Sequence, residues 1–407
     1  AAVNVAVAGT KISGKADVGV GVSVALNLVD GAARAEIEDT AVLTHGANLD
    51  LWAISSPTVR TKAEAGASGG DVSIGGAVAI TLADSVTTAR VGTGGATTLS
   101  GKLTIDASEQ NGTVFTTADG EVAGKDVGVG ATVALAITDD EVHATTERTL
   151  TASGTDASRI EATTVARVET TAKASAKGVK QESSGGSSTA NQQTNEQKDF
   201  SSSTASTTGS DAGRGNDGAA GGDTTDSSTS DGAVGVAAAI AINISDVIAE
   251  AAVKENLTTG GMLTVHSGAN ADVIAKADGR AVDKDNADVG VGVAVAINLP
   301  DVINTATIAA AKTVNTGGLT VAADMVARSG EADPQTHTLT ADATSGAGAA
   351  DVGVAGSVAI NLVDTVTRAE IGTGATVGVN NGSFNVTAAS TTNSTTKAQP
   401  TEGGATA

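Results

Sequence analysis

The stretch Asp17-Val-Gly-Val-Gly-Val-Ser-Val-Ala-Leu-Asn-Leu-Val-Asp30 decides the fold, because related versions of it recur along the chain. Each version opens on an aspartate: Asp17, Asp71, Asp126, Asp231, Asp288 and Asp351. The openings lie about 55 residues apart, except for one interval of about twice that length. A fixed period of several tens of residues indicates a fold made by stacking one structural unit.

Each repeat carries two further landmarks. A second aspartate follows the opening one by 13 residues in five repeats and by 15 in the fourth. These closing aspartates are Asp30, Asp84, Asp139, Asp246, Asp301 and Asp364. Later in most repeats comes a block such as Leu319-Thr-Val-Ala-Ala323. The repeat is therefore defined by three blocks at constant spacing.

The blocks alternate with period two, which predicts strands and almost no helix. In the first block, the even-numbered residues from Val18 to Leu28 form a Val/Leu row, and Gly, Ser, Ala and Asn occupy the opposite face. Glycine inside a strand often marks a close approach of another backbone. We therefore expect a second layer of chain against the small-residue face.

Composition favours a narrow interior. The chain of 407 residues has no Cys and no Tyr, 51 Gly, 4 Pro and 1% aromatic residues. Few large side chains are available to fill a wide core, whereas stacked coils of strand bury thin rows of Val, Ile, Leu and Ala. We predict an all-β, repetitive parallel β-solenoid (β-helix) of six repeats, three in residues 1–173 and three in residues 231–407.

The number of coils in each repeat decides what the aspartates do. Solenoid units commonly have 20 to 45 residues, so a unit of about 55 favours two or three coils. One coil per repeat would place the aspartates about 4.8 Å apart, and such a column would need a cation such as calcium. Three coils would separate them by roughly 14 Å, beyond the screening length. We favour aspartates that form turns, with a calcium ladder as the alternative.

One polar position within the strands predicts a ladder. Asn27, Asn243, Asn298 and Asn361 occupy equivalent places, with Thr81 and Ala136 in the other two repeats. Amide side chains in stacked strands form hydrogen bonds along a column. We interpret the position as structural and not as a ligand-binding stripe.

Residues 174–230 interrupt the repeats. They are rich in Ser, Thr, Gly, Asn and Gln and have few apolar side chains, among them Phe200. Such a segment cannot bury enough apolar surface to order itself. We predict a disordered, flexible insert that leaves the solenoid as a loop, with a linker between two rods as the alternative.

Charge excludes several partners. The net charge is −22, from 46 acidic and 24 basic residues without a basic cluster. Nucleic-acid binding needs a basic surface, so it is excluded as a function. No apolar run is long enough to cross a bilayer as a helix, so membrane insertion is not expected. No secretory leader is visible at the start of the chain. Because the repeat pattern is cut at both ends, we expect the chain to be a piece of a longer protein.

Few residues are candidates for catalysis or metal binding. The four histidines occupy non-equivalent positions, and no pair has the spacing of a metal motif. Weak calcium candidates are Asp283, Asp285 and Asp288, in a run that lacks the glycine and terminal glutamate of an EF-hand loop. The carboxylates of Asp139, Asp140 and Glu141 are candidates for sugar chemistry, although aromatic platforms are scarce. We therefore predict no catalytic residues and no cofactor, calcium being the one possible ion.

The repeat resembles those of very large secreted bacterial adhesins. The similarity rests on the Asp17–Asp30 pattern, the following Ala-x-Ile segment and the Gly-x-Leu-Thr-Val-x-Ala segment. It covers nearly the whole chain outside the insert and is shared with filamentous-haemagglutinin-like exoproteins and autotransporter-type surface proteins. The resemblance implies a β-helical shaft exported across the outer membrane of a Gram-negative bacterium, with no catalytic residues.

These observations predict a non-catalytic shaft segment of an extracellular adhesin at the bacterial cell surface. It would give length and surface display for attachment, cell-cell contact or biofilm formation. We expect a monomeric rod, with host surfaces, neighbouring cells or glycans bound through parts of the protein outside this segment. Two alternatives are a polysaccharide-active β-helix enzyme, lyase or hydrolase, and a calcium-dependent scaffold of a surface layer or biofilm.

Overall fold

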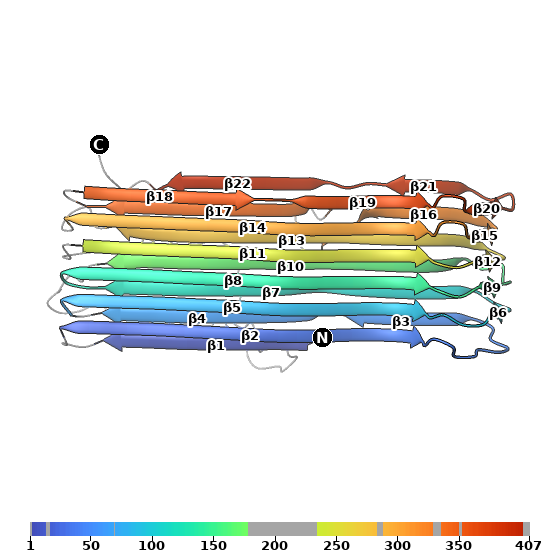
Figure 1. Cartoon of the computed structure of the whole chain (residues 1–407), viewed down its shortest axis with the longest axis horizontal. Coiled ribbons are helices and arrows are strands. Elements are labelled where there is room, and N and C mark those ends of the chain that lie inside the picture. Colours follow the sequence, from blue (N-terminus) through green and yellow to red (C-terminus); the bar gives the residue numbers. More distant parts are fainter. Residues whose placement is uncertain are drawn as a thin grey trace, which may run out of the picture.

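A computed structural model describes residues 2–13, 17–68, 70–177, 234–282, 288–328, 335–349 and 352–401. Within these ranges the chain forms strands and no helix, as predicted. The strands make three sheets, which we name A, B and C, and every pairing between named strands is parallel. Figure 1 shows the strands stacked in chain order from the first repeat to the last.

Sheet B contains the opening segments of the repeats. Its strands are long because the alternation continues beyond the closing aspartate, for example through Ile37. The last repeat divides its strand into two. The strands are β2 (Val18–Ile37), β5 (Val72–Val91), β8 (Val127–Thr146), β11 (Val234–Val253), β14 (Val289–Ile308), β18 (Val352–Asn361) and β19 (Asp364–Ile371).

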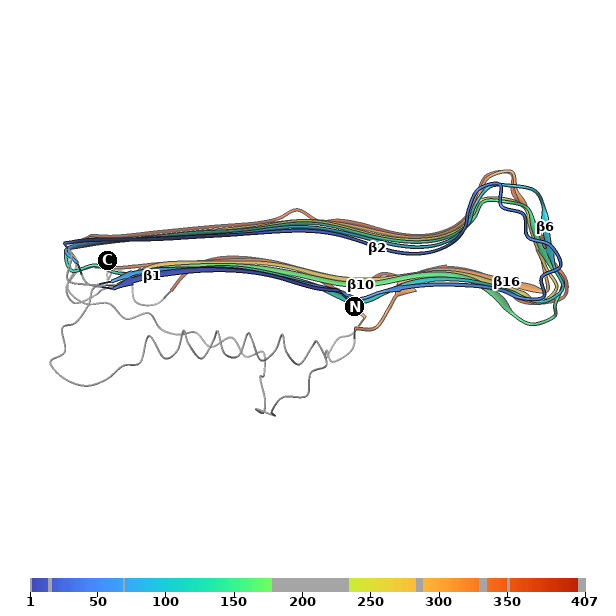
Figure 2. The same cartoon turned by 90° about the horizontal axis from the view of Figure 1, so that it is seen from below.

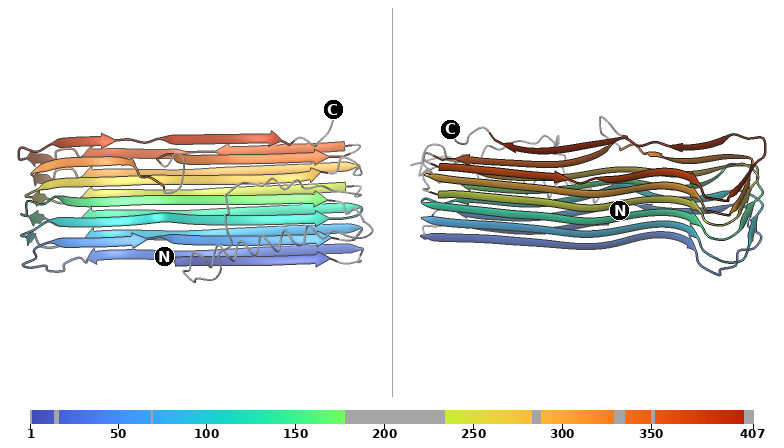
Figure 3. Two further views of the ribbon diagram at one scale, coloured as in Figure 1. Left: turned by 180° about the vertical axis from the view of Figure 1, so that it is seen from behind. Right: turned by 45° about the horizontal axis from the view of Figure 1, so that its top comes forward.

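Sheet A forms the opposite layer, which lies in front when the stack is viewed from behind (Figure 3). Its strands are β1 (Ala2–Ser13), β3 (Leu49–Ser55), β4 (Pro57–Ser68), β7 (Leu103–Ala123), β10 (Ser158–Lys177), β13 (Met262–Val282), β16 (Gly318–Met325), β17 (His337–Gly348), β21 (Phe384–Ala388) and β22 (Thr392–Pro400). Short strands form sheet C: β6 (Thr97–Leu99), β9 (Leu150–Ala152), β12 (Leu257–Thr259), β15 (Thr313–Thr316) and β20 (Thr376–Val379).

The register shows that each repeat makes one coil, meaning one passage through sheets B, C and A. Asp30 pairs with Asp84, and Asp84 pairs with Asp139 on the next strand. The expectation of two or three coils per repeat is therefore wrong. A repeat makes only one coil because its strands are long. Most strands of sheet B have 20 residues, and two strands of this length use most of a repeat.

The two long layers are close together along most of the coil and separate only at the end closed by sheet C (Figure 2). In the narrow part, inward-facing alanines of the two sheets pack together, including Ala79 and Ala134 of sheet B and Ala118 and Ala172 of sheet A. This confirms the close approach predicted from the small-residue face. A backbone layer fits there because Gly and Ala leave room for it.

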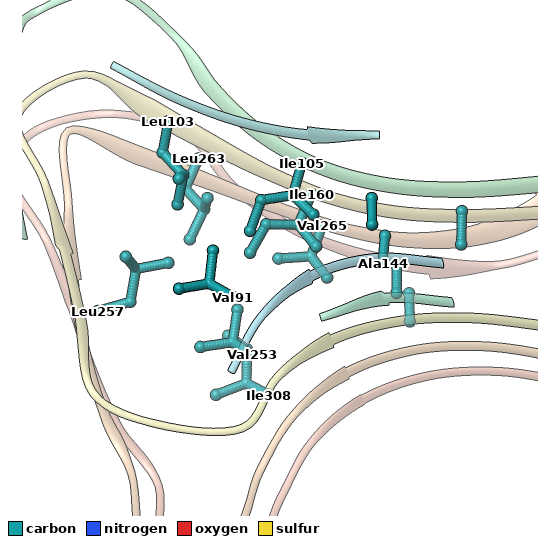
Figure 4. Packing of buried hydrophobic residues seen from close by; sticks show 14 of the residues in the cluster. Val91, Leu103, Ile105, Ala144, Ile160, Val253, Leu257, Leu263, Val265 and Ile308 are labelled. Atoms are coloured by element: carbon teal, nitrogen blue, oxygen red, sulfur yellow. The ribbon is translucent and has the colours of Figure 1, made fainter. Parts of the chain in front are cut away.

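Large aliphatic side chains are buried at the wide end. Figure 4 shows Val91, Leu103, Ile105, Val253 and Ile308 converging from different coils and sheets. The Val/Leu row of the opening segment lies elsewhere, because it faces outward and Val18 and Leu28 are 57% and 64% exposed. The expectation that these rows are buried is thus wrong, because the interior along the opening segments is narrow and is filled by small side chains such as the alanines of both sheets.

The first residues of the predicted insert belong to a strand. β10 continues through Lys177, so residues 174–177 belong to a strand that pairs with β7 and β13. The remainder of the predicted insert, to residue 230, lies outside the described residues.

Candidate functional site

The closing aspartates form a column on the outer face of sheet B. Asp30, Asp84, Asp139, Asp246, Asp301 and Asp364 are paired in register from coil to coil. Partial burial, followed by neighbouring carboxylates, raises the pKa of Asp139 and Asp301. Within the described ranges, no group of three or more Asp, Glu or His residues could hold a metal ion. The expectation that these aspartates form turns is wrong, because Asp30, Asp84 and Asp139 lie inside strands. In the described residues the column stacks like charges without the geometry of a calcium ladder.

The weak calcium candidates are not brought together in the described structure. Asp283 and Asp285 lie outside the described residues. Asp288 is exposed at the entrance to β14, and its carbonyl oxygen accepts a hydrogen bond from the amide of Val352 at 2.8 Å. Its observed contact is therefore a backbone link between adjacent coils.

The asparagine column forms the predicted ladder in the last three coils. Nδ2 of Asn243 donates to Oδ1 of Asn298 at 3.3 Å, and Nδ2 of Asn298 donates to Oδ1 of Asn361 at 3.0 Å. Asn298 also donates to the carbonyl oxygen of Val273 at 2.9 Å, which ties sheet B to sheet A. Asn243 and Asn298 are fully buried, so the column holds coils and layers together.

A row of polar residues crosses the outer face of sheet A. Trp52, Asp106, Glu161 and His266 occupy paired positions on β3, β7, β10 and β13. Arg159 links the first two, because its guanidinium lies 4.7 Å from the ring centroid of Trp52 and donates to Oδ2 of Asp106 at 2.6 Å. We call these five residues and Asp324 the polar row.

His266 is the centre of the second half of the polar row. Its Nδ1 lies 3.0 Å from Oε1 of Glu161, and its Nε2 lies 2.8 Å from Oδ1 of Asp324. These hydrogen bonds, the one with Glu161 first, raise the pKa of His266 to about 9. The imidazole is therefore charged at neutral pH and joins carboxylates of the coils on either side.

The polar row has the residue types of a sugar-processing site but not the arrangement. Burial raises the pKa of Asp106, whereas the hydrogen bond from His266 lowers the pKa of Glu161. Two carboxyls with different environments are typical of glycosidases. Here each carboxylate is paired with a cation, and Arg159 lies over the Trp52 ring, the aromatic surface that a sugar would use.

The carboxylates considered from the sequence do not converge. Asp139 and Glu141 face outward, whereas Asp140 between them is buried in the interior, as the alternation of the strand requires. Glu141 instead contacts His143 at 3.1 Å, and His143 lies 3.0 Å from Glu250 on the next coil. The hydrogen bond with Glu250 is the main cause of the raised pKa of His143.

Sequence reasoning missed two buried polar clusters, one inside the coil between sheets A and B and one at a break in sheet A. Glu109 and Asp140 belong to opposite sheets and are 1% and 5% exposed. Burial raises the pKa of Glu109 to about 7 and also raises the pKa of Asp140, to which Glu109 adds repulsion. Ser85 donates to Oε2 of Glu109 at 2.9 Å. The inward position of Asp140 was readable from the alternation, but its neighbour Glu109 required the register.

The second cluster occupies the break between β16 and β17. Nε of Arg328 lies 2.9 Å from Oδ2 of Asp272, with exposures of 6% and 3% for the two side chains. Arg328 also donates to the carbonyl oxygen of Ala166. Nearby, Nδ1 of the buried His337 accepts a hydrogen bond from the amide of Ala271 at 3.0 Å, and burial lowers the pKa of His337 to about 4. The arginine thus satisfies polar groups where the strand is interrupted.

Comparison with protein-family models, curated proteins and solved structures finds no match. The described part of the chain contains no helix that is long and apolar enough to cross a membrane. The geometry therefore defines an architectural class only: an all-β chain whose parallel sheets stack in chain order, consistent with a β-solenoid.

Proposed function

We propose that the chain is a six-repeat parallel β-solenoid that serves as a non-catalytic structural segment of a large extracellular bacterial adhesin. The observation that carries the proposal is the constant register of sheet B from coil to coil. For example, all 20 residues of β11 pair with β8 on one side and with β14 on the other. Side-chain hydrogen bonds and ion pairs, such as those of the asparagine column and the polar row, also join successive coils. Backbone and side chains therefore both stabilise the stack.

The single coil per repeat changes what such a segment contributes. A strand of 20 residues spans about 66 Å at roughly 3.3 Å per residue, whereas each coil adds only about 4.8 Å along the stack. Six coils therefore form a slab about 30 Å high and more than twice as wide. We infer that the segment supplies a broad surface for display, and that its contribution to length is small.

The pairing within the polar row favours a structural role over polysaccharide chemistry. Asp106 is held by Arg159, and Glu161 is held by His266. A general acid or a nucleophile needs access to its substrate, whereas these groups are occupied by partners on adjacent coils. The polar row supports the stack in the same way as the asparagine column.

A repeat deletion tests the proposal. Removal of residues 72–126 joins Asp71 to Val127, which pairs with Val72 in the intact chain. A structural segment keeps its β circular dichroism and cooperative unfolding after this in-phase deletion, and the full surface protein keeps its attachment to cells or surfaces.

The matched control removes residues 72–127. This deletion shifts the register by one residue and turns the Val/Leu row toward the narrow interior, so the chain should not fold. Loss of attachment with a folded in-phase variant would place a binding site in the deleted repeat. Turnover of a polysaccharide by the wild type, abolished by Asp106→Asn, would overturn the non-catalytic assignment.

A further inference from the structure

The outer face of sheet B carries a continuous aliphatic surface. It comprises the even-numbered residues Val18 to Leu28 of β2 and the residues paired with them in β5, β8, β11, β14 and β18, and we call it the aliphatic field. Every paired residue is Val, Ile, Leu, Ala or Gly. Exposure remains high on both outer coils, with 58% for Val24 and 49% for Val358.

The aliphatic field is confined to one part of the surface. Along the same strands, beyond the aspartate column, the outward residues include Arg90, His143 and Glu250. The outer face of sheet A carries charged pairs such as Lys276 with Glu169. The described opening aspartates flank the field at its other end. The field is thus an apolar centre between two acidic borders, which is the usual plan of a protein interface.

The size of the field matches a stable protein interface. Six strands at about 4.8 Å span roughly 29 Å, and 11 residues at about 3.3 Å span roughly 36 Å. The product is about 1,000 Å² per copy, or about 2,000 Å² for two copies, whereas stable interfaces bury about 1,200–2,000 Å². Exposed apolar patches on monomers are usually about 300–600 Å².

The shape and charge of the field favour a second copy as its occupant. The strands of sheet B nearly superpose when viewed along the stack (Figure 2), so the sheet is almost flat. Flat sheets of many strands are unusual and are typically stabilised by stacking on another sheet. A second copy offers an equally flat aliphatic surface, whereas an anionic membrane is repelled by the net charge of −22.

We propose that two copies of the chain pack face to face through the aliphatic field, about a two-fold axis parallel to the stacking direction. This axis makes the strands of the two copies antiparallel and superposes only the two fields. The parts of the strands beyond the aspartate column, which carry the charged residues, then lie at opposite ends of the dimer and stay in water. An axis parallel to the strands would instead place these charged parts against each other. The proposed assembly is a dimer, whereas the sequence predicts a monomeric rod.

Mass measurement by light scattering and sedimentation tests the association with the intact chain. Val133 lies at the centre of the field, so Val133→Lys places a charge in the interface while the lysine stem still covers its neighbours. The matched control is Thr340→Lys, at an outward position of sheet A. The wild type and Thr340→Lys should be dimers at micromolar concentration, and Val133→Lys should be a folded monomer.

Spin labels determine the geometry, because the chain contains no cysteine of its own. Labels on Ala131→Cys lie near the axis and should be about 20 Å apart or closer, since packed sheets lie about 10 Å apart. Labels on Ala32→Cys should be about 60 Å apart if the strands are antiparallel. The axis parallel to the strands predicts about 25 Å for the same labels.

The acidic borders of the field predict how salt changes the affinity of the dimer. In the proposed dimer the opening aspartates of one copy face the closing aspartates of the other, so added salt screens repulsion and tightens the dimer. Three results would each overturn the proposal: a wild type that is monomeric at about 100 µM, well above the micromolar constants expected for such an area; dimers that persist in Val133→Lys; or a monomer that binds neutral phosphatidylcholine vesicles through the field, which would make lipid the occupant.

Discussion

Nδ1 of His266 lies 3.0 Å from Oε1 of Glu161, its neighbour on the adjacent coil. This ion pair makes stability depend on pH. The folded-state pKa of His266 is about 9, above its ordinary value of 6.5. The contribution is therefore fully present below pH 6.5 and is lost as the pH rises through about 9.

We predict that His266→Gln removes this pH dependence. The wild type should lose on the order of 1–3 kcal/mol of unfolding free energy between pH 6.5 and 9.5, a range reduced from the full pKa shift because the imidazole is partly exposed. Urea denaturation at several pH values measures the loss. An equal slope in the wild type and the variant over that range would show that His266 is not its source.

The buried Glu109 predicts a second pH dependence of stability, at lower pH than that of His266. Burial raises its pKa from 4.5 to about 7, so the folded state binds the proton more tightly than the unfolded state. Its stabilising contribution is present below pH 4.5 and is lost as the pH rises through about 7.

Glu109→Gln should therefore be more stable than the wild type at pH 8, by about 1–3 kcal/mol, and nearly equal to it at pH 4. The exposed Asp50→Asn is the control and should leave the difference between the two pH values unchanged. A glutamine variant that is less stable at pH 8 would mean that the ionised carboxylate is needed, for example to bind a cation.

We predict that replacing Arg328 causes a large loss of stability. Its removal leaves the carboxylate of Asp272, 3% exposed, without its partner. Breaking a buried ion pair costs about 3–5 kcal/mol because the remaining charge is uncompensated. Arg328→Met should lose this amount in urea denaturation, whereas the exposed pair of Arg368 and Glu370 predicts a loss below about 1 kcal/mol for Arg368→Met. Equal midpoints for the two variants would contradict the assignment of Arg328 and Asp272 to a stabilising buried ion pair.

The sequence predicted the parts of the fold that depend on alternation. The Asp17–Asp30 segment indicated strands, its Gly and Ala face indicated a close second layer, and Asn298 indicated a ladder. The length of a coil was not predicted. Aspartate is depleted in strands, so Asp30 indicated the end of a strand, whereas β2 continues to Ile37. The Val/Leu row points outward because the interior along the opening segments is narrow, and the inward residues of these segments are Gly, Ala, Ser, Thr and Asn.

The side-chain rows depend on register, which periodicity alone does not give. His266 lies 105 residues from Glu161, and His143 lies 107 from Glu250. Once one repeat equals one coil, these pairs become neighbours across a single strand boundary. The insert between these repeats makes the separation in sequence about twice a normal period, so the histidines did not align with their partners.

Gly292 tests the close approach of the two layers most directly. A Cβ atom at this inward position of β14 would lie 2.0 Å from the carbonyl oxygen of Gly346 on β17, and backbone on both sides cannot give way. Gly292→Ala should therefore destabilise the chain by several kcal/mol, as expected for overpacking against backbone. Gly356 is the matched control, because it lies on the outer face of sheet B and a Cβ there meets no atom within 4 Å.

Gly356→Ala should be neutral or slightly stabilising, since alanine restricts the unfolded chain more than glycine does. Thermal and urea unfolding of the two variants gives the comparison. If both substitutions are tolerated equally, sheets A and B are farther apart in solution than described, and the small residues of the repeat need another explanation. If only Gly292→Ala unfolds, the glycines of the opening segment mark where sheet B rests on sheet A, and the Val/Leu row is left on the outside because the inside has no room for it.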